Sequence, residues 1–258
     1  AIFLRELDDL HANVQRPDGA YLEVATRDVA VNYTSTPRNR YTTGGYATLG
    51  DNAVWHAWLT ANIAYIRVDS LSSSDFAGVT TGAIEAIFAT YADADGFIVD
   101  IRPNSGGDET IAALFASHFT DVPVVYGYTE TRNGPSHDDF DPLVTKTLEP
   151  AAENYFDGPV VCLIGARNMS SAEWFTLMMR ACGATLIGER TRGSSGNPQV
   201  FALDNGVQYS VPTWIAYTDE LEYIEDQGIA PDITIPATTS FDDSHDYVVE
   251  RAIEELGA

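Results

Sequence analysis

The stretch Gly158–Gly183 constrains the fold most strongly, because it joins a buried strand directly to a helix. Val160–Ile164 is a continuous apolar run, too short for a helix and rich in β-branched residues, which indicates a buried parallel strand. The apolar residues that follow have helical spacing, and Gly183 is placed to end the helix. Ser170 and Ser171 therefore lie where a strand ends and a helix begins.

This position gives the two serines a chemical interpretation and a structural one. The free backbone N–H groups and the positive end of the helix dipole can stabilise an oxyanion there, so that one serine could act as a nucleophile. The structural alternative is that Ser170 or Ser171 is simply the N-cap of the helix, a common place for serine. The stretch by itself leaves both interpretations open.

The same alternation of strands and helices extends from residue 63 to the end of the chain. It predicts an α/β fold with a mostly parallel sheet flanked by helices on both faces. Residues 1–62 instead show the end of a helix over residues 2–10, followed by turns and short strands over residues 21–24, 29–33 and 46–49, a small β-rich region. We therefore expect two units, an N-terminal region over residues 1–62 and an α/β core over residues 63–258. The expected strands of this part are 63–68, 96–101, 122–128, 160–164 and 184–187, with a polar loop over residues 129–150. The expected helices include 75–92, capped by Ser73 or Ser74, 108–119 and 172–182.

Charge and hydropathy exclude several classes of partner. The formal net charge of −24 argues against nucleic acid and anionic membrane surfaces. No apolar run approaches the roughly 20 residues needed to cross a bilayer, so membrane insertion is not expected. The acidity favours an extracytoplasmic protein, secreted or periplasmic. The two cysteines, Cys162 and Cys182, are interpreted as small buried hydrophobic residues.

A second strand-to-helix turn lies at Asp100–Gly107, where a buried strand runs into a Gly-Gly pair. Glycine permits positive φ and lets backbone N–H groups face a ligand. Alone, this turn could be an ordinary βα connection or a phosphate loop that lacks the rest of its signature. Paired with the serine turn it has a chemical meaning, because acyl-transfer enzymes use two backbone donors for the oxyanion.

Four motifs in one order resemble the tail-specific (C-terminal processing) serine proteases, a family that includes the tricorn core. They are Asp-Ile-Arg-Pro-Asn-Ser-Gly-Gly (100–107), Ser-Ser-Ala-Glu (170–173), Gly-Glu-Arg-Thr-Arg-Gly (188–193) and Gly-Ile-Ala-Pro-Asp-Ile (228–233). The resemblance covers residues 63–256, with a weaker match at 1–14, and implies a crotonase-like or ClpP-like core. It also implies that Ser170 is the nucleophile and that the N–H groups of Ser171 and Gly106 form the oxyanion hole.

Two branches of this family activate the serine differently. The processing-protease branch uses a lysine shortly after the Gly-Glu-x-Thr-x-Gly motif, where this chain has Ser194. The only lysine of the chain is Lys146, which would have to fold back from a loop to reach Ser170. A Ser–Lys pair is therefore not expected.

The tricorn-like branch uses Ser, His and Glu, and this chain is similar to it. Asp9-Leu10-His11 matches its Asp-x-His element, and Glu225 matches its glutamate before the Gly-x-x-Pro-Asp motif. An imidazole suits a general base near neutral pH, and a carboxylate can orient it. The alternatives are that His11 is a surface residue at a helix end and that Glu225 belongs to a solvated acidic face, on which Glu222 is its rival.

The resemblance implies a serine peptidase that acts on peptide or protein substrates without a cofactor. Residues 12–62 are too short for the PDZ domain that such proteases commonly carry. Substrate capture would then depend on short strands that cover the cleft, or on assembly into a homo-oligomer. Two other functions remain open at this point, a non-catalytic module that binds peptides or small ligands and a hydrolase of non-peptide esters or amides.

Overall fold

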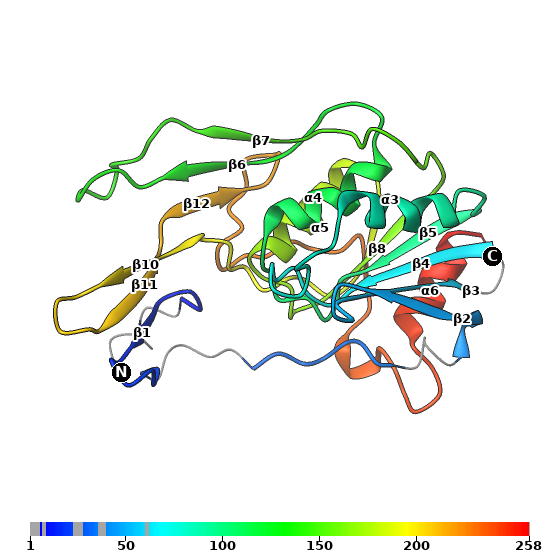
Figure 1. Ribbon diagram of the computed structural model, residues 1–258, viewed down its shortest axis with the longest axis horizontal. Helices are drawn as coiled ribbons and strands as arrows, with labels where there is room; N and C mark the ends of the chain where they lie inside the picture. The colour runs from blue at the N-terminus through cyan, green and yellow to red at the C-terminus, as the bar shows by residue number, and fades with distance from the viewer. Residues whose placement is uncertain (1–5, 7–8, 23–27, 36–39, 60–61, 258) are drawn as a thin grey trace.

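A seven-stranded sheet forms the centre of the computed structural model, which describes residues 6, 9–22, 28–35, 40–59 and 62–257 (Figure 1). The strand order is β13-β9-β8-β5-β4-β3-β2. The strands from β13 to β4 are parallel to their neighbours, and β3 and β2 continue the sheet in antiparallel fashion. The α/β class with a mostly parallel sheet is therefore confirmed. The strands are β2 (Thr42–Leu49), β3 (Val54–Leu59), β4 (Ile63–Val68), β5 (Gly96–Asp100), β8 (Val160–Ile164), β9 (Thr185–Gly188) and β13 (Ile233–Thr234).

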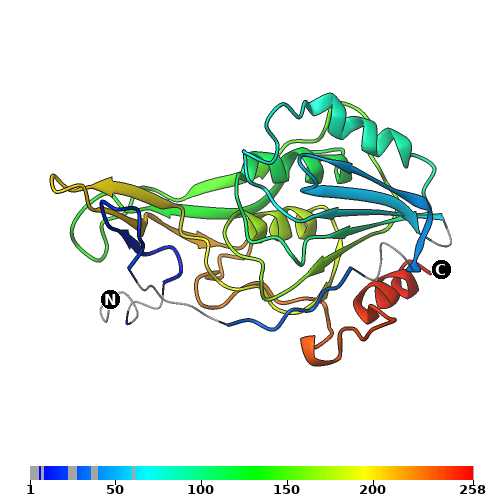
Figure 2. The same ribbon diagram turned by 60° about the horizontal axis from the view of Figure 1, so that its bottom comes forward.

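Helices cover both faces of this sheet (Figures 1 and 2). One face carries α3 (Thr81–Thr90), α4 (Glu109–Ala116), which runs into the 3-10 turn η2 (Ser117–Phe119), and α5 (Ser171–Ala181). The other carries α6 (Tyr247–Glu255), preceded by the 3-10 turn η3 (Ala237–Thr239). The two faces bury separate apolar clusters, because side chains alternate along each strand. In β4, Ala64 and Ile66 join the cluster under α3–α5, whereas Ile63 and Tyr65 join the cluster under α6.

Two smaller antiparallel sheets extend from one end of the central layer (Figures 1 and 2). One contains β12 (Trp214–Tyr217), β6 (Val124–Thr131) and β7 (Val144–Leu148), so the strand expected over residues 122–128 belongs to this antiparallel sheet and not to the parallel one. The other contains β1 (Asn13–Gln15), β11 (Gln208–Pro212) and β10 (Pro198–Ala202). Because β1 pairs with β11, the N-terminal segment lies against a part of the chain almost 200 positions away, with Asn13 opposite Ser210.

The N-terminal region contributes directly to the central sheet. The expected boundary after residue 62 passes between β3 and β4, which are hydrogen-bonded neighbours. The helix end expected over residues 2–10 lies largely outside the described residues. Residues 29–33, expected as a strand, are extended chain without strand pairing; there Asn32 donates its side-chain amide to the carbonyl of Ile164 at 2.9 Å. The described residues contain no PDZ domain.

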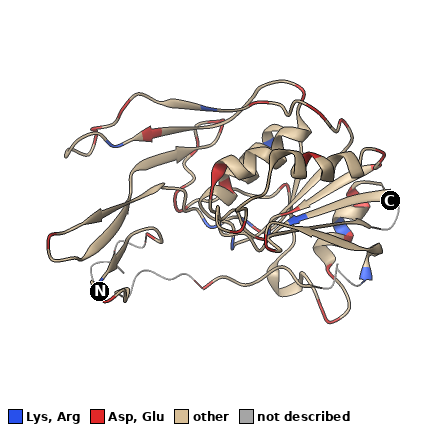
Figure 3. Cartoon of the chain, in the orientation of Figure 1, with Lys and Arg blue, Asp and Glu red and all other residues tan. Residues whose placement is uncertain are grey.

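Acidic side chains are spread over the whole molecule, whereas lysine and arginine are few (Figure 3). The excess of acidic residues makes the overall electrostatic potential negative, which disfavours polyanionic partners. Among the described residues, the helices are all too short or too polar to cross a bilayer.

Candidate active site

Ser170 occupies a strained backbone position at the N-terminus of α5. Its φ of +54° and ψ of −132° lie outside the regions that residues with a side chain normally adopt. Such strain costs on the order of 1–3 kcal/mol and persists only where the surroundings enforce it. The Ser170 side chain makes no capping hydrogen bond to the helix. The Ser170 hydroxyl therefore does not serve as a helix cap, which is what the structural interpretation of this serine requires.

The strained turn is held against the Gly-Gly turn after β5. The buried side chain of Asn168 accepts the N–H of Gly165 at 2.7 Å and donates to the carbonyl of Asn104 at 2.9 Å. Gly106, with φ of +110°, then lies so close that an added Cβ would sit 2.8 Å from Cβ of Ser170. Only glycine allows the two turns to approach in this way.

Two N–H groups at this junction are free to meet an oxyanion. Within the described chain, no hydrogen bond engages the N–H of Ser171 or of Gly107. The N–H of Gly106, in contrast, donates to the side-chain oxygen of Asn104 at 2.7 Å. The Gly-Gly turn thus presents the Gly107 N–H, while the expected Gly106 donor is engaged within the turn.

His11 reaches the same site from the N-terminal segment. Its backbone N–H donates to the carboxylate of Asp9 at 2.7 Å, and its carbonyl accepts the hydroxyl of Ser210 on β11 at 2.6 Å. Its ring is buried, and Nδ1 lies 2.9 Å from the hydroxyl of Ser194. Burial lowers the pKa of His11 against the opposing charge of Asp9, which keeps the imidazole neutral and able to accept a proton.

Two carboxylates fix the loop over residues 191–195 that lies between His11 and α5. Glu173 is fully buried and accepts the N–H of Ser194 at 2.9 Å, besides the N–H of Gly193 and two hydroxyls. Glu225 accepts the N–H of Ser195 at 2.9 Å. Glu225 therefore reaches His11 through this loop and not by a direct hydrogen bond. Its rival Glu222 is exposed and lines a different cavity.

The pKa of Glu225 makes stability depend on pH. Burial raises this pKa from 4.5 to about 7; the Ser195 N–H opposes the shift, and the charges of Glu173 and Asp9 add to it. Between these values the folded chain keeps a proton that the unfolded chain releases, so stability present below about pH 4.5 is lost as the pH rises to about 7. We expect Glu225→Gln to remove this loss, which is on the order of 1–3 kcal/mol.

Urea unfolding at about pH 4.5, 6 and 8 gives the free energy of unfolding at each pH. The effect is the difference between wild type and Glu225→Gln in how this free energy changes with pH. Buried Glu173 and His11 also titrate, but they are present in both proteins and largely cancel in the comparison. Glu222→Gln is the matched control, because this side chain is exposed. Equal pH slopes for wild type and Glu225→Gln would contradict the raised pKa.

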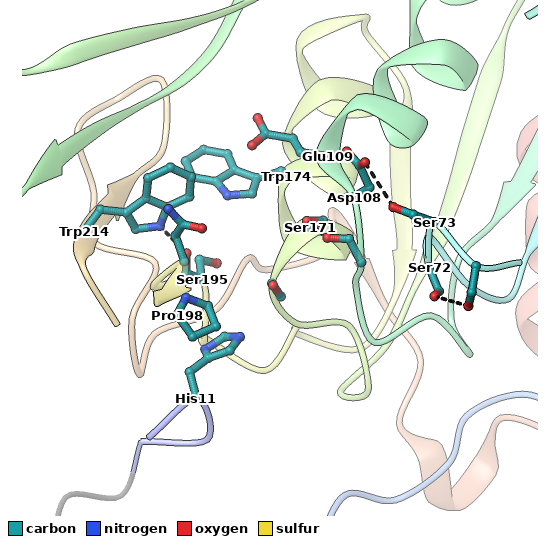
Figure 4. A pocket seen from close by; sticks show the side chains of 14 residues that line it. His11, Ser72, Ser73, Asp108, Glu109, Ser171, Trp174, Ser195, Pro198 and Trp214 are labelled. Carbon is teal, nitrogen blue, oxygen red and sulfur yellow. Dashed lines mark hydrogen bonds between the residues drawn. The ribbon is translucent and has the colours of Figure 1, made fainter. Parts of the chain in front are cut away.

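Three of the candidate residues, His11, Ser170 and Ser171, line one cavity of about 690 Å³, whereas Gly106 and Glu225 are not among its lining residues. Figure 4 shows His11 and Pro198 at one end of it and Ser72 and Ser73 at the other, with Ser171 between them. Ser170, Gly107 and Ser195 also line this cavity, and Trp174 and Trp214 form an aromatic wall. The structure thus brings His11, Ser170 and Ser171 to one site, although no hydrogen bond joins His11 to Ser170. Such contacts are often looser in the absence of substrate.

Lys146 has partners of its own at the wall of this cavity. Its ammonium group forms an ion pair with Glu109 at 3.0 Å and lies 4.7 Å from the ring centre of Trp214, and both of these residues line the cavity. Among the described residues, no hydrogen bond joins Lys146 to Ser170.

The model of peptidase family S41 matches residues 62–235 of this chain. The tricorn protease of Thermoplasma volcanium is 25% identical over 210 residues, which are 78% of this chain and 19% of that protein. The chain therefore spans less than a fifth of the length of this curated relative.

Solved structures with the same fold extend over nearly all of the chain. A candidate peptidase from Parabacteroides merdae has a TM-score of 0.81 at 24% identity, covering 100% of this chain and 81% of that one. Mature CPAF has a TM-score of 0.67 at 14% identity, covering 95% and 66%. The photosystem II D1 C-terminal processing protease has a TM-score of 0.55 at 17% identity, covering 93% and 55%.

Proposed function

Because this chain belongs to peptidase family S41, we propose that it is a serine peptidase whose nucleophile is Ser170. The family is the one that its four motifs predict. The observation that carries the assignment of Ser170 is its strained position between two turns, with a hydroxyl free of capping bonds and open to the cavity. Strain of this kind is found at functional sites, where it holds a reactive group in place.

In the proposed reaction the Ser170 hydroxyl attacks the carbonyl carbon of the scissile peptide bond, and His11 accepts the hydroxyl proton. The tetrahedral intermediate places its negative oxygen at the N–H groups of Ser171 and of the Gly-Gly turn, where Gly107 is the free donor. His11 then gives the proton to the leaving amine. A water molecule hydrolyses the acyl-enzyme by the same steps, again with His11 as the base.

Glu225 has an indirect part in this proposal. Its hydrogen bond to the Ser195 N–H fixes the loop whose next residue, Ser194, contacts His11. The carboxylate also adds negative charge near the imidazolium that forms during the reaction. We further propose that the substrates are peptides or proteins and that the chain acts outside the cytoplasm, as its acidity suggests.

A fluorophosphonate probe tests the nucleophile. The probe should modify Ser170 in the native protein, detected by mass spectrometry of the digested chain, and the heat-unfolded protein should not react. Modification depends on an activated serine and an oxyanion site, so it does not occur at an ordinary helix cap. Absence of labelling in the native protein would favour a non-catalytic binding module on the same fold.

A further inference from the structure

Ser194 contacts both partners of the proposed proton transfer. Its backbone carbonyl accepts the N–H of Ser170 at 2.6 Å, and its hydroxyl lies 2.9 Å from Nδ1 of His11. We propose that Ser194 is a positioning residue, whose hydroxyl accepts Nδ1–H of His11 and so leaves Nε2 as the basic nitrogen. This role rests on the proposed function of Ser170 and His11.

The argument depends on which ring nitrogen carries the proton. A neutral imidazole has one N–H and one lone pair, and a general base must turn the lone pair toward the nucleophile. In Ser-His-Asp enzymes a carboxylate accepts Nδ1–H and thereby selects this tautomer. An oxygen atom at Nδ1 is therefore the group that the site requires, and here that oxygen is the Ser194 hydroxyl.

No carboxylate of the described residues occupies that place. Asp9 accepts the backbone N–H of His11, Glu225 accepts the N–H of Ser195, and Glu173 accepts the N–H of Ser194 itself. Asp9 is the group whose charge acts on the His11 ring, and it raises the pKa of His11 against the effect of burial. The two glutamates hold the loop, while the Ser194 hydroxyl makes the contact with the ring.

The loop is rigid enough for such a role. Ser194 is 3% exposed and its neighbour Ser195 is 1% exposed, and buried Glu173 holds the N–H of Ser194 at 2.9 Å. A side chain with a fixed backbone and one short χ1 torsion loses little entropy when it orients a partner.

The bond to the Ser170 N–H uses the Ser194 backbone, and the bond to His11 uses its side chain. Ser194→Ala therefore removes one contact and keeps the other. Ser194→Thr keeps the hydroxyl at the cost of one methyl group. Ser240→Ala is the matched control, because Ser240 is equally buried and its hydroxyl donates to the Ala237 carbonyl at 2.9 Å, outside the cavity.

The first measurement is nitrogen NMR of the His11 ring in the wild-type protein above the pKa of His11. We expect the neutral ring to carry its proton on Nδ1, and Ser194→Ala to shift the population toward Nε2–H. A wild-type ring that carries its proton on Nε2 would overturn the proposal without any measurement of activity.

The second measurement is the rate of Ser170 labelling by the fluorophosphonate probe across pH. Ser194→Ala should label about 10- to 100-fold more slowly and with a changed pH midpoint, because a buried N–H loses its acceptor. Ser194→Thr should label within about threefold of wild type, since its hydroxyl is retained, and Ser240→Ala at the wild-type rate. Equal rates and midpoints for wild type and Ser194→Ala would overturn the role of Ser194 alone. A wild-type protein that is not labelled at Ser170 would overturn the nucleophile and this role together.

Discussion

Replacement of Ser170 by alanine is expected to lower peptide hydrolysis by at least about 10⁴-fold, because it removes the proposed nucleophile from the strained turn. The fold should be preserved, since the Ser170 side chain makes no capping hydrogen bond and the loss of Oγ leaves the backbone bonds of the turn intact. Hydrolysis of an unstructured acidic protein such as casein, followed by release of soluble peptides, measures this effect. Circular dichroism checks the fold.

The adjacent Ser171 is the matched control for this variant. Its hydroxyl donates to the carbonyl of Gly107 at 2.7 Å, and its proposed contribution to the reaction is a backbone N–H that alanine retains. Ser171→Ala should therefore lose less than about tenfold in activity, through a looser Gly-Gly turn. If Ser171→Ala were inactive and Ser170→Ala active, the two serines would have to exchange roles.

Replacement of Arg102 by alanine is expected to destabilise the fold by about 3–5 kcal/mol, a large part of the stability of a typical domain. Arg102 lies at the carboxyl end of β5 and forms ion pairs with Asp100 at 2.6 Å and with Asp246 at 3.0 Å, all with side chains that are 0% exposed. Removing the guanidinium leaves two buried carboxylates without their ion-pair partner, although the charge of Arg67 still acts on Asp100. One of these two carboxylates, Asp246, is the N-cap of α6 and accepts the N–H of Val249, so the change also removes the ion pair that holds this cap in place.

Urea unfolding at neutral pH measures this loss, with Arg251→Ala as the control. Arg251 pairs with Glu255 at 2.6 Å on the exposed face of α6, and both side chains are about one-third exposed. Such a surface pair contributes about 0.3–0.5 kcal/mol. A loss for Arg102→Ala no larger than that for Arg251→Ala would show that the buried network does not hold β5 to α6.

The sequence predicts the parts of the fold that depend on apolar patterning. The core strands are runs of β-branched and apolar residues buried on both faces, and β4 and β8 have the expected bounds. The loop expected over residues 129–150 contains β7, whose Thr-Lys-Thr centre has no apolar pattern because the strand is largely exposed. The helix expected from residue 75 begins at Thr81, since Thr80 and not an upstream serine caps it.

The sequence predicts only those parts of the site that lie within one short segment of the chain. The serine turn and the Gly-Gly turn follow from strand-to-helix junctions, but their close approach depends on Asn168, whose bonds to the Gly-Gly turn span more than 60 positions. The contact of Ser194 with His11 spans 183 positions and carries no signal in either segment. Glu173 stands within the quoted Ser-Ser-Ala-Glu motif, but the groups that donate hydrogen bonds to it come from the loop 191–195 and are apparent only in the folded chain.

The attachment of His11 has a consequence for how this molecule can lose its activity. The imidazole is joined to the body of the protein through the three-residue strand β1, whereas Ser170 is fixed to the central sheet. Local unfolding of a short strand at the edge of a sheet needs far less free energy than global unfolding. Detachment of that strand would separate the acid–base group from an intact hydroxyl, so an inactive preparation is not evidence of a misfolded one.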